Sequence, residues 1–434
     1  MTASFRITNA RVPACLARVR ARADEEGLAR VDVSVAGSRI AAISVHDPAL
    51  AAQDGDIDAQ GTIVMPCFVD AHVHLDKGHI WPRAPNPDGT FAAALATVGA
   101  DRAARWSAAD VRARMEFGLK CAYAHGTAAM RTHLDSVGPQ TRISWPVFAE
   151  LREKWAGRVA LQASPLFGIE FAQDDAHMRE VTAMLDAHGG PSPTLGAVTP
   201  MVAGMQEGLD RLFRLASDKG WALDFHADET HEISARSLRA IAGTALRFKF
   251  QHPVLAGHCC SLAQQSADEA ALTIDLAARA NLSVVSLPMC NMYLQDRTAG
   301  RTPRWRGVTA LHELKAAGVN VMIASDNTRD PFYAYGDLDM LEVFREATRI
   351  LQLDHPFGEW AASVTDAPAR ALGLVGAGRL DAGSAADFVL FRARSMTELF
   401  ARPQADRVVY RAGVKSGAKP PDHGELDHLQ GLAV

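Results

Sequence analysis

The chain has 434 residues, of which 48% are hydrophobic and 22% are charged, and its formal net charge is −5. This length and composition are typical of a globular protein with one large domain, or with one large and one small domain. The mild charge and the lack of a basic stretch argue against a nucleic-acid-binding protein, and no segment approaches the roughly 20 apolar residues of a membrane helix.

The six cysteines are scattered and form no CxxC pair. This usage is typical of reduced, mostly buried thiols in a cytosolic protein. The N-terminal segment MTASFRITNARVPACLARVRARADEEG has no unbroken apolar stretch of the kind found in secretory signals. We therefore expect a soluble, cytoplasmic protein.

Both ends of the chain are predicted to be rich in strands. The segments FRITNARV, VDVSVAGSRIAAIS and GDIDAQGTIVMP carry β-branched residues between Gly and Asp turns. Near the C-terminus, GRLDAGSAADFVLFRAR and ADRVVYRAGVKSG have strand–turn–strand patterns. We expect residues 1–62 and 376–434 to form one small β-sandwich domain, with residues 419–434 as a loosely held extension.

Between these ends, apolar strands alternate with helical patterns. Eight strands are predicted, at residues 67–73, 126–135, 159–168, 194–200, 221–229, 253–260, 282–288 and 319–327. Helices are predicted at 107–124, 173–188, 204–220, 264–280 and 307–317. This α/β alternation favours a (β/α)8 TIM-type barrel over residues 63–375, and the GxGxxG fingerprint of a dinucleotide-binding fold is missing.

Polar residues follow several of these strands, at the end where the active site of such a barrel lies. The first strand runs into FVDAHVHLDK, where His72 and His74 are two residues apart and point to one face. Two inward imidazoles suit a divalent metal. Alone, the HxH pattern also fits two ordinary polar residues at a strand end.

The fifth predicted strand runs into DFHADETHE. His226 is a candidate third metal ligand, and Glu229 beside it is a candidate proton carrier. The neighbouring Asp228, His231 and Glu232 are expected to lie in a solvated acidic turn.

The sixth and eighth predicted strands run into AGHCCS and ASDNTRDP. His258, taken alone, fits a hydrogen-bonded structural histidine, and Asp326, taken alone, fits a turn former. Asp330, directly before Pro331, is predicted to shape the turn, with Arg329 as a candidate partner. The joint occurrence of HxH, HxxE, His and Asp in strand order favours a metal site in which Asp326 is the fourth ligand.

These motifs resemble the amidohydrolase superfamily, and more closely its cytosine deaminase-like branch. PCFVDAHVHLDK, MRTHLD, FHADE, GHCCS, NMYLQDR with RWRGVT, and ASDNTRDPFYAYG recur in similar form and order. The resemblance implies one divalent metal ion, Zn or Fe, held by His72, His74, His226 and Asp326. It also implies that His258 contacts the metal-bound water or the developing oxygen, and that Glu229 shuttles the proton. Binuclear members carry a Lys after the fourth strand, which GAVTP lacks.

The residue types fit hydrolytic deamination. A metal with three neutral imidazoles and one carboxylate can lower the pKa of bound water to about 7, so that hydroxide attacks the amino-bearing ring carbon. Asp326 takes the water's proton, Glu229 protonates a ring nitrogen, ammonia leaves, and His258 stabilises the new oxygen. The predicted enzyme is a hydrolase of C–N bonds other than peptide bonds that deaminates a small N-heterocycle, cytosine-like or triazine-like.

Two positions depart from the cytosine deaminase pattern. Leu166 replaces a Gln and Asn327 replaces a second Asp, and both changes alter what the pocket can bind. The SDNxRD pattern resembles the N-isopropylammelide hydrolases, although those lack the Glu after strand five and the LQDR segment. An alternative therefore stays open, in which the enzyme cleaves another C–N bond, of an N-alkylaminotriazine or a cyclic amide. The complete ligand set disfavours a non-catalytic barrel.

Six residues are predicted to line the substrate pocket: Lys77, Leu166, Phe167, Gln295, Asn327 and Phe332. Lys77 is predicted either to hold an acidic or carbonyl group or to form a surface salt bridge. Gln295 is predicted to read an amide edge, and Phe332 to stack on a flat ring. The expected partner is a small heterocycle rather than a nucleic acid or a membrane, and the sequence leaves homo-oligomerisation open.

Overall fold

The computed structural model describes residues 4–51 and 53–431. These residues form two compact units, each assembled from separate stretches of the chain. Unit 1 comprises residues 1–70, 121–129 and 339–420, and unit 2 comprises residues 71–120, 130–338 and 421–434.

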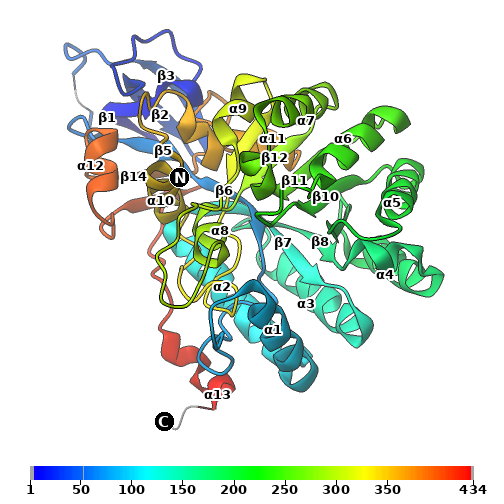
Figure 1. Ribbon diagram of the computed structural model, residues 1–434. Coiled ribbons are helices and arrows are strands. Elements are labelled where there is room, and N and C mark those ends of the chain that lie inside the picture. The colour runs from blue at the N-terminus through cyan, green and yellow to red at the C-terminus, as the bar shows by residue number, and fades with distance from the viewer. Residues whose placement is uncertain (1–3, 52, 432–434) are drawn as a thin grey trace. The chain divides into compact units, whose positions relative to one another are not determined.

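Unit 1 contains two four-stranded sheets. The first has the order β3-β2-β1-β4, from strands β1 (Ser4–Pro13), β2 (Leu28–Ala36), β3 (Arg39–Val45) and β4 (Ile57–Asp58). The second has the order β16-β15-β14-β5, from β5 (Val64–Pro66), β14 (Phe388–Leu390), β15 (Val408–Arg411) and β16 (Val414–Lys415). Since β5 pairs antiparallel with β14 (Figure 1), segments from both ends of the chain share one sheet.

The core of unit 1 follows from alternation along these strands. In β2, Val31, Val33 and Val35 point to one face and are fully or almost fully buried. They pack in one cluster with Ile7 and Phe388, so the N-terminal and C-terminal strands bury their apolar faces together. The helices of this unit are α10 (Met340–Leu351), α11 (Asp366–Ala371) and α12 (Met396–Ala401).

All eight strands predicted for the central region are present, and their C-terminal ends lie in unit 2. They are β6 (Phe68–Val73), β7 (Thr127–Asp135), β8 (Ala160–Leu166), β9 (Thr194–Thr199), β10 (Ala222–Ala227), β11 (Val254–His258), β12 (Ser283–Ser286) and β13 (Asn320–Ile323). β6, β7 and β8 form one sheet, and β9 to β13 form a second sheet that is parallel throughout. Isolated parallel bridges join Gly168 to Val198 and Val73 to Asp326.

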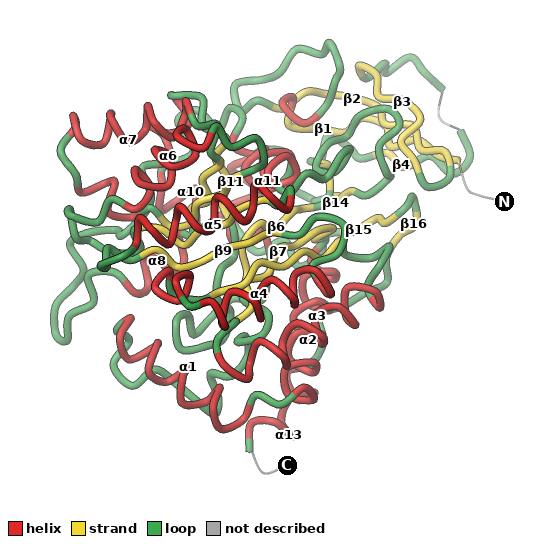
Figure 2. Tube along the Cα trace, turned by 90° about the vertical axis from the view of Figure 1, so that its right-hand side faces the viewer, coloured by secondary structure: helices red, strands yellow, loops and turns green. Residues whose placement is uncertain are grey.

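Helices surround these strands. Figure 1 shows α3 (Thr141–Lys154), α4 (Asp175–His188), α5 (Met205–Lys219), α6 (Ser237–Phe248) and α7 (Ala267–Arg279) outside the strands. α5 packs on β9 and β10, and Figure 2 shows it alongside β9. It buries Leu209, Leu212, Phe213 and Ala216, whose helical spacing places them on one face. The remaining helices include α2 (Ala108–His125) and α9 (Leu311–Ala316).

The five predicted helices are confirmed, as α2, α4, α5, α7 and α9. Five further helices of unit 2 within the described residues were not predicted: α1 (Phe91–Arg105), α3, α6, α8 (Pro288–Leu294) and α13 (Asp427–Gln430). Pro146 lies inside α3, and the residue directly before α6, Arg236, makes no capping hydrogen bond with its own side chain. α3 and α6 therefore lack ordinary sequence signals of a helix. No helix within the described parts of the chain is long and apolar enough to cross a membrane.

The C-terminal segment is not a loose extension over the residues that the structure describes. The side chain of Gln430 is buried and donates to the backbone oxygen of His79 at 2.7 Å. His423 stacks on Phe117, with ring centroids 5.4 Å apart, and Leu426 is buried. The prediction for residues 419–434 is therefore wrong as far as residue 431, and residues 432–434 lie outside the described chain.

A buried polar layer crosses the strands of unit 2. Arg131 of β7 donates to the Asp224 carboxylate at 3.0 Å and to the side-chain oxygen of Gln162 at 2.8 Å. Burial raises the pKa of Asp224 to about 6, although Arg131 opposes the shift. Gly196 of β9 makes room for this layer, because a Cβ there would lie 2.2 Å from the Asp224 backbone oxygen and 2.4 Å from Ser164 Oγ.

Gly196→Ala should therefore destabilise unit 2. The added methyl group meets backbone on one side, so the strands must shift, at a cost of about 1–3 kcal/mol. The matched control is Gly243→Ala on α6, where a Cβ meets nothing within 4 Å and the helix gains about 0.5–1 kcal/mol. Thermal unfolding of both variants checks this, and an unchanged melting temperature for Gly196→Ala would show that the layer is plastic.

Candidate active site

The four predicted metal ligands converge at the strand ends of unit 2. His74 Nε2 lies 3.1 Å from Asp326 Oδ1, His72 Nε2 lies 3.6 Å from the same oxygen, and His226 Nε2 lies 3.4 Å from His74 Nε2. An ion bound at about 2.1 Å by tetrahedral ligands would hold those ligand atoms roughly 3.4 Å apart. The observed spacings match that geometry.

The backbone fixes Asp326 beside the first strand. Its N–H donates to the His72 backbone oxygen at 2.8 Å, and its φ is +64°. A left-handed conformation is unusual for Asp and directs the carboxylate out of the β13 line. Gly257 of β11 leaves space for His72, since a Cβ there would lie 3.1 Å from the imidazole. The site is therefore built by the strand ends rather than by a long loop.

The chemistry of these groups fits a bound cation. His72, His74, His226 and Asp326 are all at most 6% exposed. Both ring nitrogens of His72 and both carboxylate oxygens of Asp326 lack a hydrogen-bond partner within residues 4–51 and 53–431. Such a cluster is costly without compensation. Burial lowers the pKa of all three imidazoles, which keeps them in the neutral form that binds a metal.

A further imidazole, which the sequence did not single out, packs against this cluster. His133 lies near the end of β7, is fully buried, and has its ring centroid 4.0 Å from that of His72 and 4.6 Å from that of His226. Its Nε2 is 3.9 Å from the Asp224 carboxylate. In the sequence, the available signal for His133 was the segment MRTHLD, where His133 lies two residues after Arg131 and therefore on the same face of the strand.

Glu229 and His258 are joined by a residue that sequence reasoning also missed. Asn291 of α8 directs its Nδ2 to Glu229 Oε1 at 3.1 Å and to His258 Nδ1 at 3.0 Å. An amide that donates to Nδ1 leaves the proton of a neutral His258 on Nε2. That Nε2 has no partner among the residues described. The sequence signal for Asn291 was the segment NMYLQDR, which begins with this residue directly after the buried Cys290.

Burial shifts the acid–base properties of both groups. Burial, together with the nearby Asp326 carboxylate, raises the pKa of Glu229 well above its ordinary value, which favours its protonated form. Burial lowers the pKa of His258 to about 4, so its imidazole is neutral. The pair therefore offers one protonated carboxyl group and one neutral N–H donor.

A cavity of about 650 Å³ opens beside these groups. Five of the six residues predicted to line the substrate pocket border it: Lys77, Leu166, Phe167, Asn327 and Phe332. Gln295 does not border it. Its Nε2 donates to the Glu229 backbone oxygen at 3.3 Å, so its contact is with the backbone of the Glu229 loop.

One wall of the cavity is charged, and another is apolar. Lys77 is buried and pairs with Asp135 at 3.0 Å, and Arg102 reaches the second oxygen of Asp135 at 2.5 Å. Burial acts to lower the pKa of Lys77, but the neighbouring carboxylates outweigh it and raise that pKa. Lys77 is thus in an ion pair that borders the cavity, not in a surface salt bridge. Phe332, 5.5 Å from Lys77 Nζ, begins the apolar wall.

Asp228 is not in a solvated turn, as the sequence suggested. It is 7% exposed, its Oδ1 accepts from the Ser237 N–H at 2.7 Å, and its Oδ2 accepts from the Leu238 N–H at 3.0 Å. It therefore satisfies the N-terminal N–H groups of α6. The expected exposure of His231 and Glu232 is confirmed.

Asp330 shapes its turn as predicted, but its partner is Asn327 rather than Arg329. Asp330 is fully buried, and its Oδ1 accepts from the backbone N–H groups of Phe332 and Tyr333 at 2.8 and 3.2 Å. Its Oδ2 accepts from Asn327 Nδ2 at 2.7 Å.

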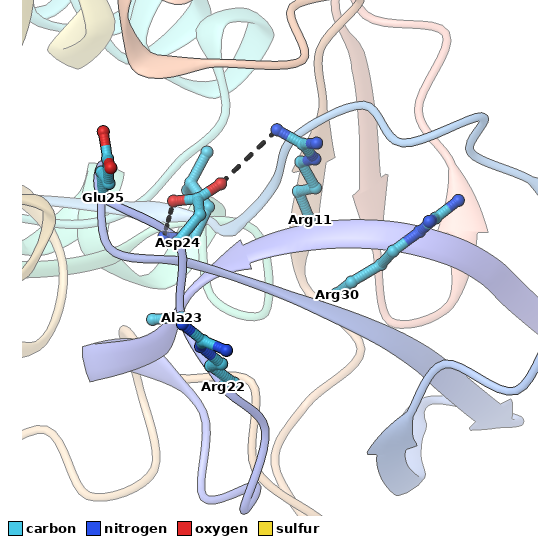
Figure 3. Close-up of a pocket in the computed structure, with 7 residues that line it drawn as sticks. Arg11, Arg22, Ala23, Asp24, Glu25 and Arg30 are labelled. Atoms are coloured by element: carbon cyan, nitrogen blue, oxygen red, sulfur yellow. Dashed lines mark hydrogen bonds and ion pairs between the residues drawn. The ribbon is translucent and has the colours of Figure 1, made fainter.

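A second hollow, of about 520 Å³, lies in unit 1. Its charged residues, among them Arg11, Arg22 and Arg30, are largely exposed. Figure 3 shows these arginine side chains spread apart, with Arg11 facing Asp24 at 3.5 Å. The hollow thus has no convergent set of buried polar groups, and the cavity of unit 2 is the candidate active site.

Comparison with known proteins agrees with this geometry. Residues 128–418 match the model of the Amidohydrolase family. The chain belongs to the amidohydrolase family. It is a hydrolase acting on C–N bonds, and the family is metal-dependent. The predicted resemblance to this superfamily, and the predicted α/β fold, are confirmed.

Three similar proteins stand out. The chain is 52% identical to a pterin deaminase of Rhizobium rhizogenes (strain K84 / ATCC BAA-868), over 99% of this chain and 97% of the relative. A 5-methylcytosine deaminase from Klebsiella pneumoniae, solved with 5-fluorocytosine, superposes with a TM-score of 0.82 at 24% identity, over 96% of this chain and 98% of that one. At this identity the likeness shows the fold alone. An N-isopropylammelide isopropylaminohydrolase from Burkholderia multivorans ATCC 17616 gives a TM-score of 0.73 at 25% identity, over 96% and 98%.

Asn291→Ala should reduce turnover by about 10- to 100-fold, the range typical of residues that orient groups around a metal site. The change removes the shared donor that orients His258 and Glu229. Met292→Ala, on the exposed side of the same helix, should leave turnover unchanged. Steady-state kinetics with elemental analysis of metal content checks this, and an equal loss in both variants would point to a disturbed helix instead.

Proposed function

We propose that this amidohydrolase deaminates a 2-amino-4-oxo heterocycle of the pterin class, with release of ammonia. The identity of 52% to a pterin deaminase over nearly the whole of both chains carries this proposal. The cavity of about 650 Å³ lies within the range of small-molecule sites and can accept a fused two-ring substrate. This narrows the sequence prediction, which named cytosine-like or triazine-like substrates.

The proposal includes one divalent metal ion, Zn or Fe. His72, His74, His226 and Asp326 would hold it, because their ligand atoms have the right spacing and lack other partners. When bound, such an ion supplies a polarised water whose pKa is lowered toward neutrality.

Three side chains of this protein would then move or hold protons. Asp326 has carboxylate oxygens free to take a proton from water. Glu229, protonated because of its burial, is placed to give its proton to the ring nitrogen beside the reacting carbon, and later to assist the leaving amine. His258 would donate through Nε2 to the oxygen that adds to the carbon, as an oxyanion donor does.

Pocket residues would hold the heterocycle in place. Phe167 and Phe332 supply apolar and aromatic surface for a flat ring. The ammonium group of Lys77 is placed to attract a ring carbonyl oxygen. Leu166 gives one wall no hydrogen-bonding capacity, and we propose that Lys77 and Asn327 are among the polar residues that recognise the ring. Gln295 would act indirectly, by holding the backbone at Glu229.

The architecture that we propose for this enzyme completes the predicted one. The two bridges at Gly168–Val198 and Val73–Asp326 join the edges of the two sheets in unit 2, which supports a closed (β/α)8 barrel. The shared sheet of β5 and β14 supports a small β-sandwich domain built from both ends of the chain.

A second candidate function is hydrolysis of an N-alkylamino group or a cyclic amide. Asn327 favours it, because an Asn follows the metal-ligand Asp in the SDNxRD pattern of the N-isopropylammelide hydrolases. The structural likeness to an N-isopropylammelide isopropylaminohydrolase agrees.

Metal-replete protein should release ammonia from pterin and give a product in which oxygen replaces the amino nitrogen. Mass spectrometry of the products separates the candidates, since the second predicts an alkylamine or a ring-opened acid. Cytosine, an aminotriazine and an N-alkylaminotriazine complete the panel. Turnover of the N-alkylaminotriazine alone would overturn the proposed function.

Glu229→Gln should keep the metal and lose about 10²- to 10⁴-fold in turnover, because only proton transfer is removed. Asp326→Ala is the contrasting variant and should lose both the metal and the activity. Elemental analysis and turnover of each variant check this pair. A fully active Glu229→Gln enzyme would show that another group carries the proton.

A further inference from the structure

Asp330 determines which way the side-chain amide of Asn327 points. We propose that it is a positioning residue which makes Asn327 a hydrogen-bond acceptor for a ring N–H of the substrate. The proposal deepens the proposed function and rests on it for the identity of the substrate. It concerns Asn327, one of the two positions at which this chain departs from the cytosine deaminase pattern.

The contacts of Asp330 decide the orientation. Its carboxylate is fully buried and receives three donors, two from the backbone of the turn and one from Asn327. Burial raises the pKa of Asp330 to about 7, so above that pH its carboxylate is ionised and only accepts hydrogen bonds. The nitrogen of the Asn327 amide must therefore face Asp330, at 2.7 Å. This argument resolves the ambiguity between nitrogen and oxygen that otherwise attends an amide side chain.

The oxygen of the amide is then left for a ligand. Asn327 Oδ1 lies 3.7 Å from Cys290 Sγ, and a thiol is a weak donor. A carboxamide oxygen has two lone pairs, so one stays available. Asn327 is 5% exposed and borders the cavity, directly after the metal-ligand Asp326. The cavity wall thus holds a neutral acceptor beside the Asp326 carboxylate in the chain.

The chemistry of the other groups gives this acceptor a specific task. Glu229 and Asp326 are engaged in proton transfer, and Leu166 offers no polar atom. A heterocycle with an N–H beside its amino-bearing carbon would satisfy Asn327 Oδ1, whereas a methyl group on that nitrogen would leave the buried oxygen unpaired. We therefore expect the enzyme to select heterocycles with a free N–H at that ring position.

The test uses one isosteric variant and its rescue. Asp330→Asn keeps an oxygen for the turn but replaces the second oxygen by a donor, so the Asn327 amide turns over and presents nitrogen to the substrate. In Asn327→Asp/Asp330→Asn, the new carboxylate accepts from the new amide and again presents an oxygen. KM for pterin should rise by roughly 10- to 100-fold in the single variant and largely return in the double variant.

The conditions and controls separate orientation from general damage. Assays at pH 8 keep Asp330 ionised, because burial raises its pKa to about 7. Metal content and melting temperature should match the wild type. Wild type should also bind 3-methylpterin roughly 10- to 100-fold more weakly than pterin, and Asp330→Asn should narrow that difference. Unchanged KM in Asp330→Asn, or a loss that the double variant does not rescue, would overturn the proposal.

A measurement without substrate keeps this proposal distinct from the proposed function. In a crystal structure at about 1 Å resolution, amide hydrogens become visible. Wild type should show the Asn327 nitrogen on Asp330, and Asp330→Asn should show the Asn327 oxygen there. If wild type does not deaminate pterin, the proposed function fails, while this arm still decides the orientation. An Asn327 oxygen facing Asp330 in wild type would overturn the orientation itself.

Discussion

The central constraint in this protein is a buried centre of three imidazoles and one carboxylate that the protein itself does not satisfy. His72, His74, His226 and Asp326 lie within hydrogen-bonding or near-bonding distance of one another. Yet most of their polar atoms have no partner in the described part of the chain. A fold tolerates such a cluster only when a bound ligand offsets the free-energy cost of removing these polar atoms from water. The neutral imidazoles and the charged Asp326 leave room for one positive ion.

Glu229 and His258 differ from the candidate metal ligands because both are hydrogen-bonded to Asn291. Asn291 occupies Nδ1 of His258 and one oxygen of Glu229, so neither side chain is free to rotate. That leaves His258 with a single outward N–H, and Glu229 with a proton that burial favours. Hydrogen bonding thus distinguishes Glu229 and His258 from the candidate metal ligands, although His74, His226 and Asp326 border the same cavity as they do.

The sequence predicted what strand periodicity and residue chemistry can encode. All eight central strands were found, because each is a short apolar run bounded by turns. The four residues predicted as metal ligands lie together, as expected when strand ends meet at one face of such a fold. Helix α3 was missed because Pro146 interrupts its pattern, and α1 was missed because its Ala-rich sequence has weak periodicity. Asp228 was misjudged because a cap on a following helix requires tertiary structure to be recognised.

The residues that were missed or misplaced act through a partner far away in sequence. Asn291 contacts Glu229 and His258, and Gln295 contacts the backbone of Glu229 instead of the cavity. Neither contact follows from the local pattern of α8, since both depend on how that helix approaches β10 and β11. Local sequence thus predicts which chemistry is present, whereas long-range packing decides which atom of each group is free to perform it.

The turn after β13 shows why that last distinction matters for specificity. A second carboxylate at position 327 would add negative charge close to Asp326 and Glu229 and would further favour the protonated form of Glu229. Asn327 avoids that charge, but a free amide could present either a donor or an acceptor. Asp330 removes the choice by accepting from Asn327 Nδ2. The negative charge thus lies on Asp330, behind Asn327, and Asn327 Oδ1 remains as the acceptor at the cavity wall.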